Sequence, residues 1–190
     1  MKTLNTYITE WKANTTTVSS IKGTYFIYKL DERGQIKIFD KDWPQLKKYK
    51  DKVYINGEHI ELDGRDHTNE EFEPGIYEVE IKDIDNVTNC LYMFYDCIHL
   101  IEVPLFNTSK VEDMYGMFSC CKNIKEVPLF DTSNVQDMRW MFENCVNIKE
   151  VPLFNMSKLK NKAGMFKHCE NLSEQTKKEW SQIYDFKANL

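Results

Sequence analysis

Residues 124–145 read IKEVPLFDTSNVQDMRWMFENC, and most of this stretch recurs in the second half of the chain. A Met-Phe pair returns every 24 residues, and a cysteine follows three residues after each Phe: the pairs begin at Met93, Met117, Met141 and Met165, and the cysteines are Cys97, Cys121, Cys145 and Cys169. The segment Val-Pro-Leu-Phe occurs three times in the same register, and a degenerate first copy contains Val79, Ile81, Val87 and Cys90. A unit this short cannot bury its own apolar face, so the copies must stack on one another.

Each copy combines two hydrophobic patterns. Val127 and Leu129 are two residues apart, which is typical of one face of a short strand, and their columns fit the L-x-x-L-x-L pattern of leucine-rich repeats. The residues that follow have helical spacing: Val135, Met138, Met141, Phe142 and Cys145. A capping box between the two patterns indicates a helix start, as Ser109 with Glu112 and as Ser133 with Gln136.

The sequence therefore predicts an α+β fold: a short leucine-rich-repeat-type solenoid with parallel short strands and helical returns. We expect three regions: an α+β N-terminal cap (1–75), repeats of period 24 (76–172) and a C-terminal capping helix (173–190) with Ser173 as its N-cap. Within the N-terminal cap we expect an amphipathic helix containing Leu4, Tyr7, Ile8 and Trp11, strands at 21–30 and 35–39, a short helix starting at Asp42, and a hairpin of 53–55 with 59–62 around Asn56-Gly57.

The core D-T-S-N-V-x-D-M-x-x-M-F at residues 131–142 closely resembles the BspA-like leucine-rich repeats, and the resemblance covers residues 79–172. It implies a leucine-rich solenoid of a kind often found on bacterial surfaces, where it binds proteins in adhesion or host contact. The opening residues 1–8 faintly resemble those of small proteins from bacteriophages of gut bacteria.

The expected partner-binding surface is the outward face of the strands. Because each position repeats one residue type, stacking predicts three columns: Glu102, Glu126 and Glu150; Pro104, Pro128 and Pro152; and Phe106, Phe130 and Phe154. The phenylalanine column is either a buried seam, which we favour, or an exposed aromatic strip. The alternative surface is the acidic N-terminal cap, with Glu70, Glu71 and Glu73.

Composition and motifs disfavour several classes of function. A net charge of −5 argues against nucleic acid as the main ligand, and no stretch approaches the roughly 18 apolar residues of a membrane span. Without an export signal the expected location is cytoplasmic, or the cell surface or a virion if a signal was removed or a phage encodes the chain. No catalytic motif or Cys-x-x-Cys pair occurs. A metal-ligating cluster is conceivable, but a polar hairpin end is favoured for it: His59, Asp63, Asp66, His67 and Glu70.

These observations predict a non-enzymatic module that binds a protein without cofactors or metal. The alternative is a structural or assembly component, of a phage particle or a homo-oligomer, with the same surfaces packed on copies of the chain. The cysteine column is expected to be buried and reduced, whereas Cys120 and Cys90 are expected to be the accessible thiols.

Overall fold

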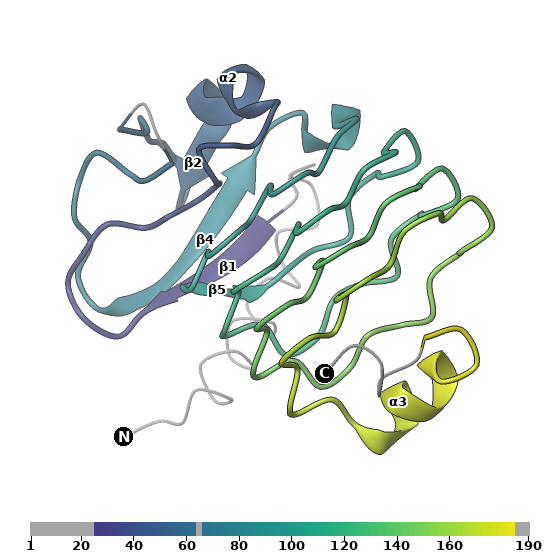
Figure 1. The fold of residues 1–190 in the computed structure, drawn as a ribbon. Helices are drawn as coiled ribbons and strands as arrows, with labels where there is room; N and C mark the ends of the chain where they lie inside the picture. Colours follow the sequence, from purple (N-terminus) through teal and green to yellow (C-terminus); the bar gives the residue numbers. More distant parts are fainter. Residues whose placement is uncertain (1–24, 64–65, 185–190) are drawn as a thin grey trace, which may run out of the picture.

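The computed structural model describes residues 25–63 and 66–184 (Figure 1). The predicted helix around Leu4 and Trp11, the start of the strand expected at 21–30, and the last residues of the C-terminal region lie outside these ranges. Within the described residues, no helix is long and apolar enough to cross a membrane.

One antiparallel sheet forms the N-terminal part of the molecule. Its strand order is β3-β2-β4-β1-β5, with β1 at Tyr25–Leu30, β2 at Val53–Ile55, β3 at Glu58–His59, β4 at Gly75–Ile81 and β5 at Leu100–Glu102. The predicted hairpin is confirmed as β2 and β3, and its turn residues Asn56 and Gly57 have φ values of 49° and 87°, which suits a tight turn. The second strand, predicted at 35–39, does not form. Lys37 makes only an isolated antiparallel bridge with His67.

Helices are short and few in the described chain. They are α2 (Leu46–Tyr49), the 3-10 turns Lys50–Lys52 and Ile84–Asn86, and α3 (Glu174–Trp180). The first begins later than predicted, because the Asp42 N–H is bonded to the Asp40 carboxylate (2.9 Å) and Gln45 takes the N-cap position. Ser173 is the N-cap of α3, as predicted, and its Oγ accepts from the Thr176 N–H at 3.1 Å.

The repeats wind into coils that stack side by side between the sheet and α3 (Figure 1). Alternate backbone N–H groups around each Met-Phe pair donate to carbonyls of the next coil. For example, Gly116 N–H donates to Arg139 and Phe118 N–H donates to Met141, both at 2.9 Å. These bonds join each coil to its neighbour along the whole stack.

The predicted parallel strands and helical returns are wrong. The only sheet in the described residues is antiparallel, and parallel pairing is limited to isolated bridges: Asp113 with Asp137, Glu126 with Glu150, and Asp137 with Asn161. The return segments are consecutive turns, because half of their N–H groups bond to the next coil instead of to their own. Trp140 and Asn144 also have φ values of 59° and 56°, which an α-helix does not accept.

The predicted capping boxes are wrong for the same reason. The Ser133 N–H donates to the Asp131 carboxylate at 3.0 Å, which forms a local turn instead of a helix start. Gln136 bonds to Glu112 of the preceding coil, through its backbone N–H at 2.8 Å and its side chain at 3.3 Å. The S-x-x-E/Q residues therefore link neighbouring coils.

The leucine column, which defines a leucine-rich repeat, faces solvent. Leu105, Leu129 and Leu153 are 64%, 60% and 49% exposed, so the description of the chain as a leucine-rich solenoid is wrong. The Phe130 N–H donates to the Pro128 carbonyl at 3.0 Å, and this tight turn breaks the strand alternation. As a result the Phe turns inward and the Leu turns outward.

The apolar face predicted around the Met-Phe pair is confirmed as the core. Val135, Met138, Met141, Phe142 and Cys145 have no exposed surface. Successive Phe rings of the pairs stack nearly parallel, at centroid distances of 5.6, 5.8 and 5.7 Å through Phe94, Phe118, Phe142 and Phe166. The second phenylalanine column, Phe106, Phe130 and Phe154, lies beside it and is buried, which confirms the seam.

Both ends of this aromatic core are closed. Phe26 of β1 lies 5.1 Å from the Phe94 ring, and Trp180 of α3 lies 5.1 Å from the Phe166 ring. At the last coil the Phe166 N–H donates to the Tyr184 hydroxyl at 3.3 Å, in place of the carbonyl of a further coil. The indole N–H of Trp180 donates to the Val151 carbonyl at 3.1 Å. Trp180 and Tyr184 thus satisfy groups that an open C-terminal end of the stack would expose.

Candidate functional site

One face of the stack carries residues that change from coil to coil. They flank the Met-Phe pairs and form three columns: Leu91, Tyr115, Arg139 and Ala163; Tyr92, Gly116, Trp140 and Gly164; and Tyr95, Ser119, Glu143 and Lys167. The columns of Val-Pro-Leu-Phe, by contrast, do not vary. Packing between coils accounts for the repeated core residues, whereas these three columns are not restricted to one residue type.

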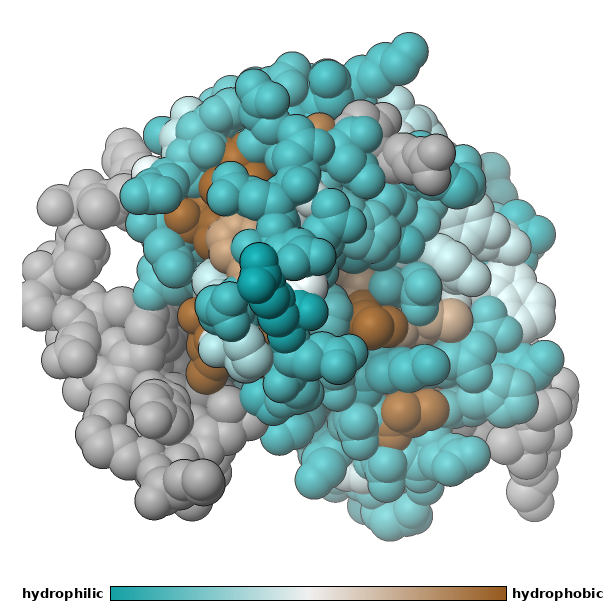
Figure 2. All heavy atoms as spheres, turned by 90° about the vertical axis from the view of Figure 1, so that its left-hand side faces the viewer, coloured by the Kyte–Doolittle hydropathy of each residue, from teal (hydrophilic) through white to brown (hydrophobic). Residues whose placement is uncertain are grey.

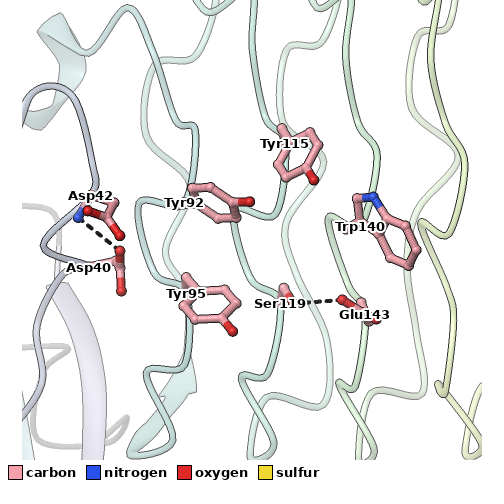
Figure 3. Close-up of a pocket in the computed structure, with 8 residues that line it drawn as sticks. All are labelled: Asp40, Asp42, Tyr92, Tyr95, Tyr115, Ser119, Trp140 and Glu143. Atoms are coloured by element: carbon pink, nitrogen blue, oxygen red, sulfur yellow. Dashed lines mark hydrogen bonds between the residues drawn. The ribbon is translucent and has the colours of Figure 1, made fainter.

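A groove with a volume of about 420 Å³ crosses this face (Figure 3). We call it the aromatic groove, and its lining residues are Asp40, Asp42, Tyr92, Tyr95, Tyr115, Ser119, Trp140 and Glu143. The two aspartates come from the segment before α2, and the other residues come from three successive coils. Figure 3 shows the four rings spread over three coils, with Tyr92 and Tyr95 in the first, Tyr115 in the second and Trp140 in the third. The aspartates lie at one end, and Glu143 lies near Trp140 at the other.

Two glycines make room for the largest rings of the groove. A Cβ added at Gly116 would lie 2.7 Å from ring carbons of Tyr92, and one at Gly164 would lie 2.6 Å from the Trp140 ring. Both glycines have positive φ, 58° and 66°. Each ring therefore lies directly against the backbone of the next coil, which restricts its movement.

The rings contact one another and the chain's own cations. The Tyr92 ring is edge-on to Tyr95 at 5.5 Å and to Tyr115 at 5.1 Å. Cationic groups lie over three rings of the groove: Lys37 over Tyr95 (5.7 Å to the centroid), Arg139 over Tyr115 (5.0 Å) and Lys167 over Trp140 (5.3 Å). These distances are within the range of cation–π attraction.

The three carboxylates of the groove differ in how far they are neutralised. Asp40 is buried and accepts from the Lys37 ammonium at 3.0 Å. Asp42 is exposed and pairs with the exposed Lys41 at 2.6 Å. Glu143 accepts from the Ser119 hydroxyl at 3.4 Å and forms no ion pair with any residue that the structure describes. Glu143 is thus the carboxylate of the groove whose charge is least compensated.

Two tyrosines of the groove, Tyr92 and Tyr95, have raised pKa values and are hydrogen-bond donors at neutral pH. Burial, together with the hydrogen bond and proximity to Tyr115, raises the pKa of Tyr92 to about 12. The pKa of Tyr95 is also raised, first by proximity to Cys120 and then by burial. Protonated phenols suit the binding of a polar ligand, because they can donate to it without losing a proton.

The residues predicted to bind a partner lie outside the aromatic groove. Glu126 and Glu150 are exposed and form a bridge, and Glu102 is half-buried. Pro104, Pro128 and Pro152 are half-buried, while the Phe106, Phe130 and Phe154 side chains are in the core. The exposed apolar residues of that face are Leu105, Leu129 and Leu153, which we call the leucine ridge.

Glu70, Glu71 and Glu73, on the acidic N-terminal surface that is the alternative in the sequence, do not line the aromatic groove. Figure 2 views the molecule from the side of β2 and α2, and this face is mostly hydrophilic with small separate hydrophobic spots. Glu71 and Glu73 lie near the Arg33 guanidinium, at 3.0 and 3.7 Å.

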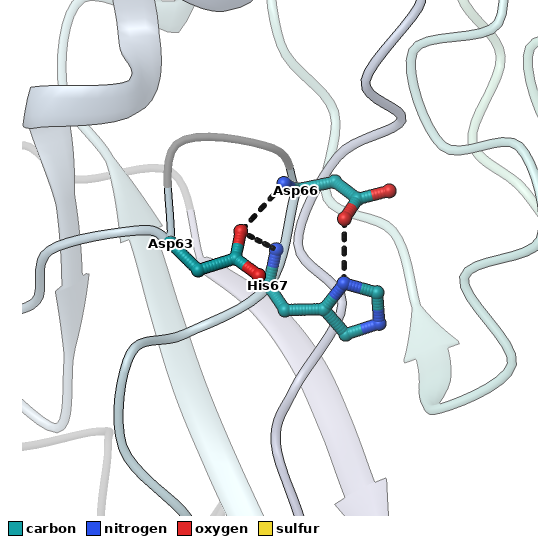
Figure 4. A group of neighbouring side chains, drawn as sticks. All are labelled: Asp63, Asp66 and His67. Atoms are coloured by element: carbon teal, nitrogen blue, oxygen red, sulfur yellow. Dashed lines mark hydrogen bonds and ion pairs between the residues drawn. The ribbon is translucent and has the colours of Figure 1, made fainter.

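Three of the five residues considered as metal ligands lie close together (Figure 4). The ligand atoms of Asp63, Asp66 and His67 are within 4.8 Å of one another. One Asp63 oxygen accepts from the backbone N–H groups of Asp66 and His67, and Asp66 pairs with the His67 ring at 2.5 Å. His59 instead contacts the Asp51 carbonyl at 3.1 Å. These bonds account for the cluster as a polar turn.

The cysteine column is buried, as predicted, and its thiols are free. The Cys121, Cys145 and Cys169 thiols donate to backbone carbonyls of the preceding coil, at 2.9, 3.0 and 2.9 Å. The Cys97 thiol donates to the Ile38 carbonyl. The expectation that Cys90 is accessible is wrong, because its side chain has no exposed surface. Cys120 is partly exposed, and its φ of 64° turns it away from the core beside the groove.

We expect a thiol-reactive probe to modify Cys120 alone in the native protein. The other five thiols are buried, and burial raises the pKa of each, so the reactive thiolate does not form at neutral pH. Mass spectrometry of the protein after brief labelling would show one adduct, which the Cys120→Ser variant lacks. A second adduct formed at the same rate on Cys121 or Cys145 would contradict the buried column.

Sequence reasoning missed Tyr92, Tyr115, Trp140 and Glu143 because it looked for residues that repeat. A signal was present. Once the copies are aligned on the Met-Phe pair, the positions beside that pair are the ones where bulky aromatic residues and glycines replace one another.

The fold and groove define a class: a repeat protein whose coils stack between a sheet and a short helix and present a variable aromatic face. The chain belongs to the family described as "Mycoplasma protein of unknown function, DUF285", whose model matches residues 67–181, more than half of the chain. No curated protein and no solved structure matches the chain.

Proposed function

We propose that the protein is a non-enzymatic binding module that contacts a partner protein through the aromatic groove. The observation that carries this proposal is the gathering of four aromatic rings from three coils at variable repeat positions on one face. A stack with an invariant core can change its outward residues at little cost in stability, so such a face suits recognition of one particular partner.

The composition of the groove supports protein binding. Tyr and Trp are enriched among the residues that contribute most to protein interfaces, because they bury a large area and lose little side-chain entropy. Tyr92 and Trp140 are already held against Gly116 and Gly164, so binding would immobilise little further. The resemblance of the repeats to the BspA-like family, whose members are thought to bind proteins, agrees with this proposal.

Photo-cross-linking tests the proposal. We would place a photoreactive phenylalanine analogue at Tyr115 in the groove and, as a matched control, at Leu129 on the leucine ridge. Each variant would be irradiated in an extract of the cells that naturally produce the protein. We expect one discrete product from position 115, which excess unmodified protein suppresses, and none from position 129. A product from position 129 only, or no suppressible product from position 115, would overturn the groove as the contact surface.

The leucine ridge favours a second candidate function, that of an assembly component. Leu105, Leu129 and Leu153 are exposed and in register, and a contiguous apolar strip gains free energy when another chain covers it. Sedimentation equilibrium tests this candidate. A stable oligomer that Leu129→Lys converts to monomer would support it, and a monomer at all concentrations would exclude self-assembly.

A further inference from the structure

We infer that the partner group held by the aromatic groove is the cation of a lysine or arginine side chain. This inference rests on the proposed function and names the chemistry of its ligand. The juxtaposition that carries it is a set of four aromatic rings on three successive coils, with Asp40 and Asp42 at one end and Glu143 at the other.

The charges of the groove select the sign of the ligand. Glu143 lacks an ion-pair partner within the described part of the chain, and it lies in the same coil as Trp140. A neutral apolar side chain would remove water from this carboxylate without replacing its interactions, which is unfavourable. An anion would be repelled by it. A cation instead neutralises the carboxylate and contacts the negative faces of the rings.

The chain's own cations show that the rings accept this chemistry. Lys37, Arg139 and Lys167 lie over Tyr95, Tyr115 and Trp140, all within 6 Å of the ring centroids. Tyr92, between Tyr95 and Tyr115, has no such cation among the residues that the structure describes. A partner side chain that enters over Tyr92 meets no competing cation from the described part of the chain there and can extend across the coils toward Glu143.

The geometry also suits a long side chain. The rings of Tyr92 and Trp140 lie against the backbone of the following coils. They therefore provide a flat apolar surface on which a methylene chain can pack. Lysine and arginine combine such an apolar stem with a charged end. The proposed contact therefore uses both this aromatic surface and the Glu143 carboxylate.

A titration followed by NMR tests the inference. The probes are Nα-acetyl-lysine-N-methylamide, the norleucine analogue, which has the same four-carbon chain without the ammonium group, and maltotriose as a neutral sugar. The reporter is the indole N–H signal of Trp140, identified by its loss in Trp140→Phe. We expect the lysine probe to shift this signal at millimolar concentration and the other two probes to leave it unchanged.

Matched variants test whether the Glu143 charge contributes to binding of the lysine probe. We expect Glu143→Gln, which keeps the size of the side chain, to weaken binding of the lysine probe about fivefold, the scale of one exposed cation interaction. Glu126→Gln, which removes an exposed carboxylate outside the groove, should leave binding unchanged. Lys167→Gln should strengthen it, because the chain's own cation no longer competes for Trp140.

The outcomes separate the two proposals. Equal shifts by the lysine and norleucine probes, a shift by maltotriose alone, or no shift by any probe would overturn the inference. If these failures accompany a cross-linked product from position 115, the binding function stands and only its cationic ligand is wrong. If the lysine probe binds as expected but no cross-linked product forms, the affinity of the groove for such a cation stands, and its role in binding a partner protein is wrong.

Discussion

Replacing Phe142 with alanine is expected to lower the free energy of unfolding by about 3–5 kcal/mol. Phe142 is fully buried and stacks between Phe118 at 5.8 Å and Phe166 at 5.7 Å, in the middle of the aromatic core. Its removal leaves a cavity that both neighbouring coils border, so their shared interface weakens as well. Urea denaturation followed by circular dichroism gives the measurement.

The matched control is Leu129→Ala, which removes an exposed side chain of the same repeat. We expect that change to alter the free energy of unfolding by less than about 0.5 kcal/mol. A loss below about 1 kcal/mol for Phe142→Ala, or an equal loss for Leu129→Ala, would mean that the inward and outward faces of the coil are misassigned.

Alkaline pH is expected to destabilise the protein by a comparable amount. Burial raises the pKa of Cys90, Cys97, Cys121, Cys145 and Cys169 above the ordinary 9.0, in the case of Cys169 to about 12. A thiol in the unfolded chain ionises near pH 9, whereas the buried thiol keeps its proton, so unfolding releases protons above pH 9. From pH 9 to pH 10 each thiol costs about 1 kcal/mol of stability, and the five together cost about 5 kcal/mol.

The stability contributed by these thiols is therefore fully present below pH 9, and it is lost as the pH rises toward the pKa values of the thiols in the folded protein. Urea denaturation at pH 7, 9 and 10 measures it. The variant Cys145→Ala serves as the control, because it removes one titrating group and should reduce the pH slope by about one proton. A stability that is constant from pH 7 to pH 10 would contradict the buried thiol column.

The sequence was sufficient to predict the core face of the repeats but not their backbone. Identical residues at a fixed interval show which side chains must meet in a stack, and Phe142 and Cys145 were placed correctly for that reason. The spacing of Val135, Met138 and Met141, however, suits consecutive turns as well as a helix. Positive φ values at Trp140 and Asn144 decide for turns. Asn often adopts such a φ, but Trp does so rarely, so the residue type at position 140 does not indicate the turn.

Two further errors came from local patterns that neighbouring residues override. The alternation of Val127 and Leu129 predicted one inward face, but the turn between Pro128 and Phe130 reverses it. The antiparallel sheet joins strands far apart in the chain, such as β1 with β5. This pairing depends on contacts between distant segments, which the hydrophobic pattern of one segment does not predict. The groove was missed because its residues belong to different coils and vary among them.

The central claim is that the variable face, and not the invariant one, binds the partner. The most direct test compares the affinity of a partner captured by cross-linking for two folded triple variants. One carries Tyr92→Ala, Tyr115→Ala and Trp140→Ala, and the other carries Glu102→Lys, Glu126→Lys and Glu150→Lys. We predict a loss of at least about 100-fold for the first, since hot-spot aromatics contribute about 2 kcal/mol or more each, and less than about threefold for the second. Unchanged affinity of the aromatic variant, with a large loss for the glutamate variant, would contradict the account.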